Sequence, residues 1–378
     1  MAGFYIHIPF CRKQCFYCDF HFTVSLKQLN RMIGAITEEI KERKHEFAEI
    51  QIDTIYFGGG TPSILSTNEL SKLISLIQEN YQINPDAEIT LEANPDDLSQ
   101  DYLSDLRKET TINRLSIGVQ SFNDEILKFL NRQHNSKTAY KSIIHAQNEG
   151  FDNINIDLIY GIPGMEGQLW RDSLRKFRAL KIPHLSAYHL TIEPKTVFSY
   201  YLKKGKIRPV EEEESLLQFR TLLQFAKENN YEHYEISNFS KPGYLSRHNL
   251  SYWNGDPYIG IGPSAHSYNQ KQRRWNVSNN TKYCHLLLNN SDEYFEYEEI
   301  DTKTAFNEYL MTSLRTSRGI EITHLKDLFG AEYLSEFESS VQTFLKQGSV
   351  IKEGEKYCLS NDGKFIADYV ISELMTVG

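Results

Sequence analysis

Residues 11–18 read Cys-Arg-Lys-Gln-Cys-Phe-Tyr-Cys. This stretch places three cysteines, Cys11, Cys15 and Cys18, at CxxxCxxC spacing directly after the strand-like run at residues 5–8. The other two cysteines, Cys284 and Cys358, stand far away, which makes an odd total of five. Because a disulfide framework needs paired cysteines, the grouping is typical of a metal site in a reducing compartment.

Three chemistries compete for this group of cysteines. Three thiolates can hold three irons of a [4Fe–4S] cube and leave the fourth iron open. A zinc ion, with His21 completing a Cys₃His site, is the second alternative, and three buried free thiols are the third. We favour the cube, because one aromatic-rich loop carries all three sulfurs. The natural occupant of an open iron is a chelating amine and carboxylate, and S-adenosylmethionine offers both.

Outward from this loop, short β-type runs alternate with amphipathic helical runs. Strands are predicted at residues 5–8, 54–57, 88–91, 114–118, 153–159 and 184–191, and helices near 27–47, 67–81, 99–108, 123–130, 137–149 and 168–180. Six β/α units indicate a parallel sheet. Polar groups recur at successive strand ends: the Gly58–Thr61 turn, Glu92, Gln120 and Asp157. In a barrel such positions converge on one mouth, so we predict an α/β fold with a partial (β/α)6 barrel over residues 1–230.

The remainder of the chain divides into two parts. Residues 231–268 are rich in Gly, Pro, Asn and aromatic residues, and we predict an irregular extension over residues 231–300. Residues 301–378 are predicted to form a small winged-helix-like α+β domain, with helices at 303–316, 322–329 and 332–347, a hairpin at 350–359 and a final helix. This last part carries 8 Lys and Arg against 12 Asp and Glu, which argues against DNA binding.

The composition of the 378 residues is that of an ordinary folded protein, with 40% hydrophobic and 24% charged residues. The formal net charge of −9 would repel a phosphate backbone, so we expect no nucleic-acid partner. The sequence has no secretory pattern at its start and no run approaching the ~18 apolar residues of a membrane span. We therefore expect a cytoplasmic protein.

The motifs along the first half of the chain resemble one family. Residues 5–11 (YIHIPFC), 58–62 (GGGTP), 92–95 (EANP), 118–122 (GVQSF), 131–132 (NR) and 155–161 (NIDLIYG) are similar, in order and spacing, to the radical-SAM enzymes related to oxygen-independent coproporphyrinogen III oxidase. The resemblance implies a [4Fe–4S] cluster held by Cys11, Cys15 and Cys18. It also implies S-adenosylmethionine contacts from Tyr5, Tyr17, Gly59, Gly60, Thr61, Glu92, Gln120, Arg132 and Asp157.

Three features distinguish the chain within that family. The oxidases carry a further cysteine two positions after the third, where this sequence has Phe20. Residues 248–253 (HNLSYW) contain HNxxYW, which resembles the signature of the HemW branch of haem chaperones. The sequence also begins only a few residues before its first predicted strand, so we expect it to lack the N-terminal extension of the oxidase.

The resemblance to the HemW branch implies a protein that binds haem and delivers it to an acceptor protein. An exposed imidazole is a good axial ligand for haem iron, so we predict that His248 contacts haem and that Tyr252 and Trp253 lie against the macrocycle. The alternatives are a true coproporphyrinogen III oxidase of porphyrin biosynthesis and a zinc-stabilised interaction protein. Whether the chain is an enzyme is left open.

Overall fold

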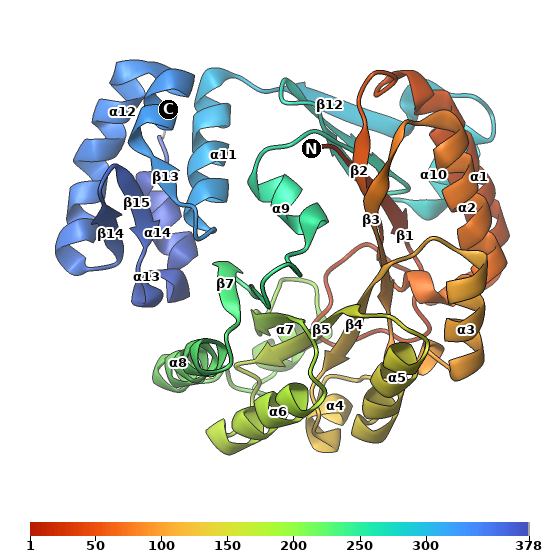
Figure 1. Cartoon of the computed structure of the whole chain (residues 1–378), viewed down its shortest axis with the longest axis horizontal. Coiled ribbons are helices and arrows are strands. Elements are labelled where there is room, and N and C mark those ends of the chain that lie inside the picture. The colour runs from red at the N-terminus through yellow and green to blue at the C-terminus, as the bar shows by residue number, and fades with distance from the viewer. Residues whose placement is uncertain (377–378) are drawn as a thin grey trace.

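The computed structural model describes residues 1–376 and contains one large sheet and one small one. Six strands follow one another in chain order and pair in parallel: β1 (Gly3–Ile8), β2 (Ile52–Gly59), β3 (Ile83–Ala93), β4 (Arg114–Gln120), β5 (Asn153–Tyr160) and β6 (His184–His189). Most residues of these strands are apolar and buried, as is typical of parallel strands covered by helices. The sheet curves but does not close, so the predicted partial barrel is confirmed (Figure 1).

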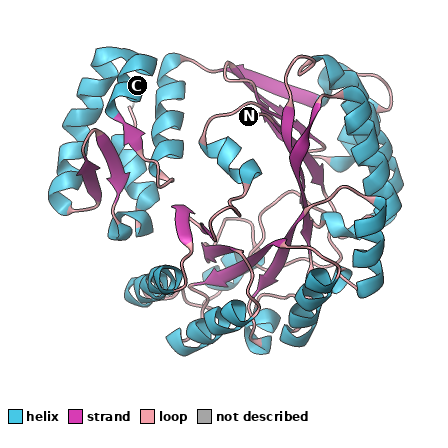
Figure 2. Cartoon of the chain, in the orientation of Figure 1, coloured by secondary structure: helices cyan, strands magenta, loops and turns pink. Residues whose placement is uncertain are grey.

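Helices cover the outer face of the curved sheet (Figure 2). The crossover helices are α1 (Leu29–Glu42), α2 (Thr67–Asn80), α3 (Gln100–Glu109), α4 (Asp124–Phe129), α5 (Ser136–Asn148) and α6 (Gly167–Ala179), with short 3-10 turns η1 (Leu26–Gln28), η2 (Arg43–His45), η3 (Pro62–Ile64) and η4 (Pro95–Asp97). Each buries one apolar stripe; α1, for example, buries Met32, Ile36 and Ile40 at helical spacing. Side-chain caps start several of them, such as the Ser66–Glu69 capping box of α2.

Residues 231–300 differ from the predicted irregular extension, because they continue the large sheet at both edges. Strands β7 (Glu232–Glu235) and β8 (Asn238–Ser240) join antiparallel beside β6. Strand β9 (Tyr258–Ile261) pairs parallel to β1, followed outward by β10 (His266–Tyr268), β11 (Gln272–Asn276) and β12 (Phe295–Glu299). These strands have three to five residues each, which is too short for a clear alternation of polar and apolar side chains.

The helices after β6 are α7 (Val197–Lys203), α8 (Glu212–Glu228), α9 (Arg247–Trp253) and α10 (Asn280–Leu287), with the turn η5 (Asp292–Tyr294). Helix α9 lies between the barrel and the C-terminal helices rather than on the outer face (Figure 1). It contacts β2 on one side and the first helix of the C-terminal part on the other. Among the described residues, no helix has both the length and the apolar character needed to cross a membrane.

The C-terminal part has its own hydrophobic core, distinct from that of the barrel. It contains α11 (Thr302–Leu314), β13 (Ile320–Glu321), α12 (Ile322–Gln347), β14 (Val350–Glu353), β15 (Lys356–Leu359), α13 (Asn361–Phe365) and α14 (Ala367–Leu374). The three strands form an antiparallel sheet in the order β13-β15-β14. Gly330, at φ 88°, interrupts α12 between the two helices predicted from the sequence. The domain boundaries after residues 230 and 300 stay predictions.

Candidate functional site

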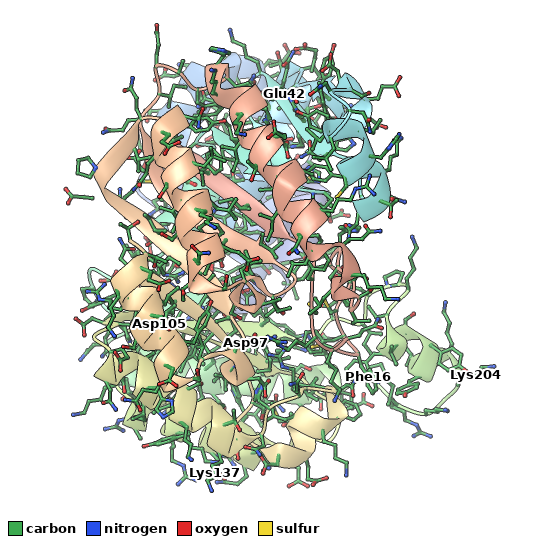
Figure 3. All side chains as sticks on the ribbon, turned by 90° about the vertical axis from the view of Figure 1, so that its right-hand side faces the viewer. Phe16, Glu42, Asp97, Asp105, Lys137 and Lys204 are labelled. Carbon is green, nitrogen blue, oxygen red and sulfur yellow. The ribbon has the colours of Figure 1, made fainter. Side chains whose placement is uncertain are left out.

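The loop that carries the three cysteines is closed at its base and anchored along its length. The Cys11 N–H donates to the Thr23 carbonyl (3.0 Å), and the Thr23 N–H donates to the Pro9 carbonyl (2.9 Å). At the middle of the loop, the Phe16 N–H donates to the Leu130 carbonyl (3.2 Å). The Phe16 ring packs against Tyr201 of α7, near the segment that carries Lys204 (Figure 3). These contacts position the cysteines at the carboxyl ends of the barrel strands.

A cavity of about 520 Å³ lies at this mouth of the barrel. Its lining includes eleven of the predicted site residues, namely Cys11, Cys15, Tyr17, Cys18, Gly59, Gly60, Thr61, Glu92, Gln120, Arg132 and Asp157. They come from the cysteine loop, from β2, β3, β4 and β5 near their carboxyl ends, and from the turn after β2. Arg132 comes from the loop between α4 and α5. The fold therefore brings together side chains that are up to 146 positions apart in the sequence (Cys11 to Asp157).

Donor groups point at the cysteine sulfurs. The Thr61 hydroxyl donates to Cys11 Sγ (3.4 Å), and Arg132 Nη1 donates to Cys15 Sγ (3.1 Å). Arg132 Nη2 donates to the Gly118 carbonyl (2.7 Å) and to Asn94 Oδ1, so the guanidinium is held from two sides. Such donors stabilise thiolates and tune an iron–sulfur cluster.

Two carboxyl groups are buried in the same cavity. Glu92 accepts a hydrogen bond from the Tyr56 hydroxyl (2.7 Å), and burial raises the pKa of Glu92 from 4.5 to about 7. Asp157 accepts from Asn155 Nδ2 (2.7 Å), and burial raises the pKa of Asp157 as well. Carboxyl groups in such places are acceptors for the hydroxyl and amine groups of a ligand that displaces water.

The glycine turn after β2 has a steric reason. A Cβ on Gly60 would stand 2.6 Å from the Phe10 carbonyl oxygen, and Gly59 has φ +111°. The backbone of the turn after β2 can therefore lie against the cysteine loop only because residues 59 and 60 are glycines. At the end of β4, Gln120 has φ 64°, a strained backbone conformation of the kind that occurs at binding sites.

Two of the predicted site residues, Tyr5 and His248, are absent from the described lining of this cavity. Tyr5 lies within the barrel, stacked on Tyr56, and its hydroxyl is 3.0 Å from His7 Nδ1. The prediction of an exposed imidazole at His248 is wrong, because its ring is buried. Its Nδ1 is 2.7 Å from the Thr54 hydroxyl and its Nε2 is 2.9 Å from the Tyr252 hydroxyl. Burial lowers the pKa of His248 to about 3, so the neutral ring has both nitrogens engaged inside the protein.

Several residues at the cavity were not predicted from the sequence. Asn94 bridges the site, accepting from Arg132 and donating to the Thr61 hydroxyl (3.0 Å). Tyr188 and His189 end β6 and face the cavity. The rule that selected Glu92 and Asp157, a polar side chain at a strand's carboxyl end, applies equally to His189 and would have found it.

The side chains at the loop fit an iron–sulfur cluster better than zinc. His21, the predicted fourth zinc ligand, is 2.7 Å from Asn280 Oδ1 and does not line the cysteine cavity. Within residues 1–376, no three His, Cys, Asp or Glu side chains converge closely enough to hold one metal ion. A zinc ion requires such convergence, whereas a cube takes each thiolate at a different iron.

The chain is similar to known proteins in sequence and in fold. Residues 5–177 match the Radical SAM superfamily. The fold matches that of coproporphyrinogen III oxidase (HemN) from Escherichia coli, with a TM-score of 0.85 and 24% identity over 99% of this chain and 90% of the other. The barrel and its cysteine loop thus define a radical-SAM protein.

The relatives of this chain identify a narrower family within the radical-SAM proteins. The haem chaperone HemW of Bacillus subtilis is 32% identical over 99% of both chains. The haem chaperone HemW of Lactococcus lactis is 31% identical over 98% of this chain and 96% of its own length. The chain therefore belongs to the HemW haem chaperone family.

Proposed function

We propose that this protein binds haem and transfers it to an acceptor protein, and that it carries a [4Fe–4S] cluster and S-adenosylmethionine at the barrel mouth. The observation that supports this most is the similarity to haem chaperones over nearly the whole chain. Phe20 adds to it, because this side chain, 70% exposed, lies at the cavity where the coproporphyrinogen oxidases are expected to carry another cysteine.

The residues at the mouth divide into two roles. Cys11, Cys15 and Cys18 would each bind one iron, and the cluster would supply the open iron and an electron. Gly59, Gly60 and Thr61 would admit the methionyl end of S-adenosylmethionine, with Glu92 as an acceptor for its amine. Arg132 would pair with the carboxylate of S-adenosylmethionine. Tyr17, Gln120 and Asp157 would contact its adenosine, with Asp157 accepting from the ribose hydroxyls. Tyr5 would act indirectly, through its stacking on Tyr56, whose hydroxyl donates to Glu92.

The cofactor part is tested by anaerobic reconstitution with iron and sulfide. We expect close to four irons per chain and brown material, and the triple variant Cys11→Ala, Cys15→Ala, Cys18→Ala should bind none. Cys358→Ala is a matched control, because that thiol lies in the C-terminal part. Stoichiometric zinc with no iron would instead favour the zinc-stabilised interaction protein.

The carrier part is tested by hemin titration of the reconstituted protein. We expect stoichiometric binding with a shifted Soret band, followed by loss of that band when an apo-haemoprotein is added. The same preparation, given coproporphyrinogen III, a reductant and S-adenosylmethionine, should leave the substrate unchanged. Substrate consumption without hemin binding would contradict the proposal and favour the oxidase.

A further inference from the structure

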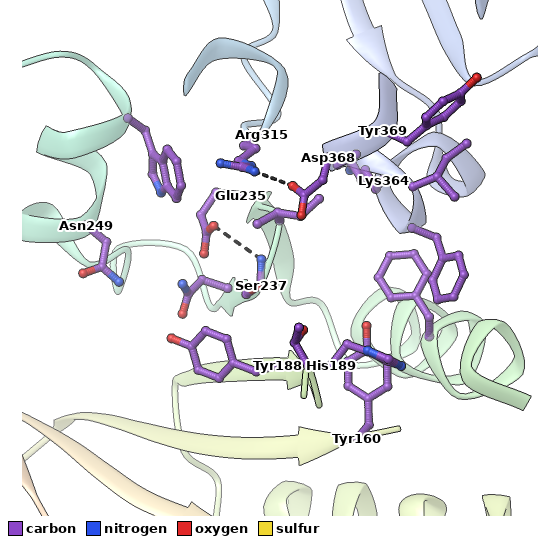
Figure 4. A pocket seen from close by; sticks show the side chains of 18 of the residues that line it. Tyr160, Tyr188, His189, Glu235, Ser237, Asn249, Arg315, Lys364, Asp368 and Tyr369 are labelled. Atoms are coloured by element: carbon purple, nitrogen blue, oxygen red, sulfur yellow. Dashed lines mark hydrogen bonds and ion pairs between the residues drawn. The ribbon is translucent and has the colours of Figure 1, made fainter. Parts of the chain in front are cut away.

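A second cavity, of about 700 Å³, lies between the barrel and the C-terminal part (Figure 4). The ends of β5 and β6, with β7 and β8, form its floor, and α9 forms one side. Residues 364–369, at the junction of α13 and α14, form the opposite side. This volume is within the range of cavities that enclose a cofactor-sized molecule.

The second cavity borders the cluster cavity. Tyr188, His189 and Thr191 line both, so a ligand in the second cavity would lie directly beside the cysteine site. Tyr188 and His189 are the last two residues of β6 and are exposed at this junction.

The HNxxYW segment forms part of the wall of the second cavity. Asn249, Tyr252 and Trp253 line it, whereas His248 on the same helix turns into the barrel toward Thr54. The segment therefore presents an amide and two aromatic rings to the cavity, and its imidazole serves to hold Tyr252 in place.

His189 is the histidine with a free nitrogen at this cavity. Its Nε2 is 3.0 Å from the Ser215 hydroxyl, and its Nδ1 has no hydrogen-bond partner within residues 1–376. When Nε2 donates to Ser215, the lone pair of the neutral ring lies on Nδ1, because the bond made by one ring nitrogen decides which tautomer is present.

Two cations face the cavity from the C-terminal part. Arg315 pairs with Asp368, whose side chain is 87% exposed (Figure 4). Lys364 is half-buried and has no carboxylate within 4.0 Å in the described part of the chain; its Nζ is 3.4 Å from His233 Nδ1. The other acid in the lining, Glu235, is buried and accepts from the Ser237 N–H (3.3 Å). An unpaired, half-buried cation in a chain of net charge −9 is a receptor for an anionic group.

We propose that haem binds in this second cavity, with His189 Nδ1 as an iron ligand and with Lys364 and Arg315 receiving its propionates. This assignment rests on the proposed carrier function and names the place where the cargo is held. Tyr252 and Trp253 offer apolar ring surface to the macrocycle. The bond to iron uses the lone pair of Nδ1, so no group is oxidised or reduced when haem binds.

The experiment compares histidine variants of the reconstituted full-length protein by hemin titration, with Soret absorption and ferric-haem EPR as readouts. His189→Ala and His189→Gln should lose the histidine-ligated spectrum, and added imidazole should restore it in His189→Ala. His248→Ala should keep the histidine-ligated spectrum, because its ring faces Thr54 and not the iron; loss of its contact with Tyr252 should change only the affinity for hemin. His285→Ala, an exposed residue of α10, is the matched control. Iron and sulfide content reports whether each variant is folded.

A second comparison tests the cation. Lys364→Gln should weaken hemin binding about tenfold, the loss expected for one charge-assisted hydrogen bond. It should leave binding of hemin dimethyl ester, which lacks the carboxylates, unchanged.

The outcomes separate the two proposals. If the wild-type protein binds no hemin, the carrier function itself is wrong. If it binds hemin and both His189 variants keep the wild-type spectrum and affinity, the carrier function stands and this assignment of the site is overturned. This assignment of the site is also overturned if the folded His248→Ala variant loses the histidine-ligated spectrum.

Discussion

At the residue scale, the cysteine loop requires a residue without a side chain at position 60. Gly60 stands against the Phe10 carbonyl, a backbone atom that cannot rotate away as a side chain could. The geometry of the cysteine loop thus depends on a residue that contacts no ligand through a side chain of its own.

We therefore expect Gly60→Ala to displace the cysteine loop and lower the iron bound after reconstitution to less than about half that of wild type. Gly34→Ala in α1 is the matched control, since its nearest neighbour would be 4.0 Å from the new Cβ. Iron analysis and thermal unfolding measure both. Normal iron loading in Gly60→Ala would show that the loop tolerates the shift.

The buried carboxyl of Glu92 predicts a pH dependence of stability. Its pKa is about 7 when folded and 4.5 ordinarily, so between these values the folded chain holds a proton that the unfolded chain has released. The contribution of Glu92 to the free energy of unfolding therefore falls, by about 3 kcal/mol at most, as pH rises through this window. Above the window it stays constant.

Relative to wild type, Glu92→Gln should accordingly gain stability between about pH 5 and about pH 8. Urea unfolding of the apoprotein at both values measures the difference. The exposed Glu49→Gln should show no such trend. A constant difference between Glu92→Gln and wild type would mean that Glu92 is ionised throughout.

At the element scale, a buried ion pair ties the end of the first barrel helix to β9, the strand beside β1. Arg43, in η2, donates to Glu39 (3.1 Å) and to the Gly260 carbonyl of β9 (2.7 Å), while Glu39 accepts from the Gly262 N–H (2.8 Å). Both side chains of the pair are fully buried. The pair thus helps to hold β9 beside β1. Strand β9 was not predicted from the sequence.

Removing one partner of such a pair leaves an uncompensated charge in the core. We expect Arg43→Leu to lower the free energy of unfolding by about 3–5 kcal/mol. Lys41→Ala, which breaks the exposed pair with Glu38, should cost less than about 1 kcal/mol. Chemical denaturation of both variants checks this, and equal losses would rule out a special role for the buried pair.

Elements were predictable where their periodicity is long. The six barrel strands and their helices lie close to the predicted residues, because each carries a full apolar stripe or run. Strands β7 to β12 were not foreseen, because edge strands of this length are set by their neighbours in the sheet. The break at Gly330 follows from a residue type that interrupts helices wherever it takes a positive φ.

At the scale of the whole molecule, the proposed haem cavity exists only where barrel, α9 and C-terminal part meet. Besides the Arg220–Asp362 ion pair, which joins α8 to α13, an isolated bridge pairs Glu235 with Thr316. A ligand in this cavity would stabilise both sides of the junction at once.

Hydrogen exchange tests this coupling directly. Bound hemin should slow exchange in α9 and across α13 and α14, while α2, on the outer face of the barrel, stays unchanged. Protection restricted to the barrel strands would place haem in the cluster cavity instead.

The sequence by itself determined the class of the site, because ligand chemistry depends on residue types at close spacing, and Cys11, Cys15 and Cys18 share one loop. Long apolar periodicities also predicted the six β/α units, and the polar groups at successive strand ends favoured a barrel over an open sheet. Only the tertiary structure decided which histidine has a free nitrogen. His248 and His189 are the same residue type, and whether an imidazole faces a cavity or a neighbouring hydroxyl depends on contacts such as Thr54 and Ser215, which lie 194 and 26 positions away in the chain.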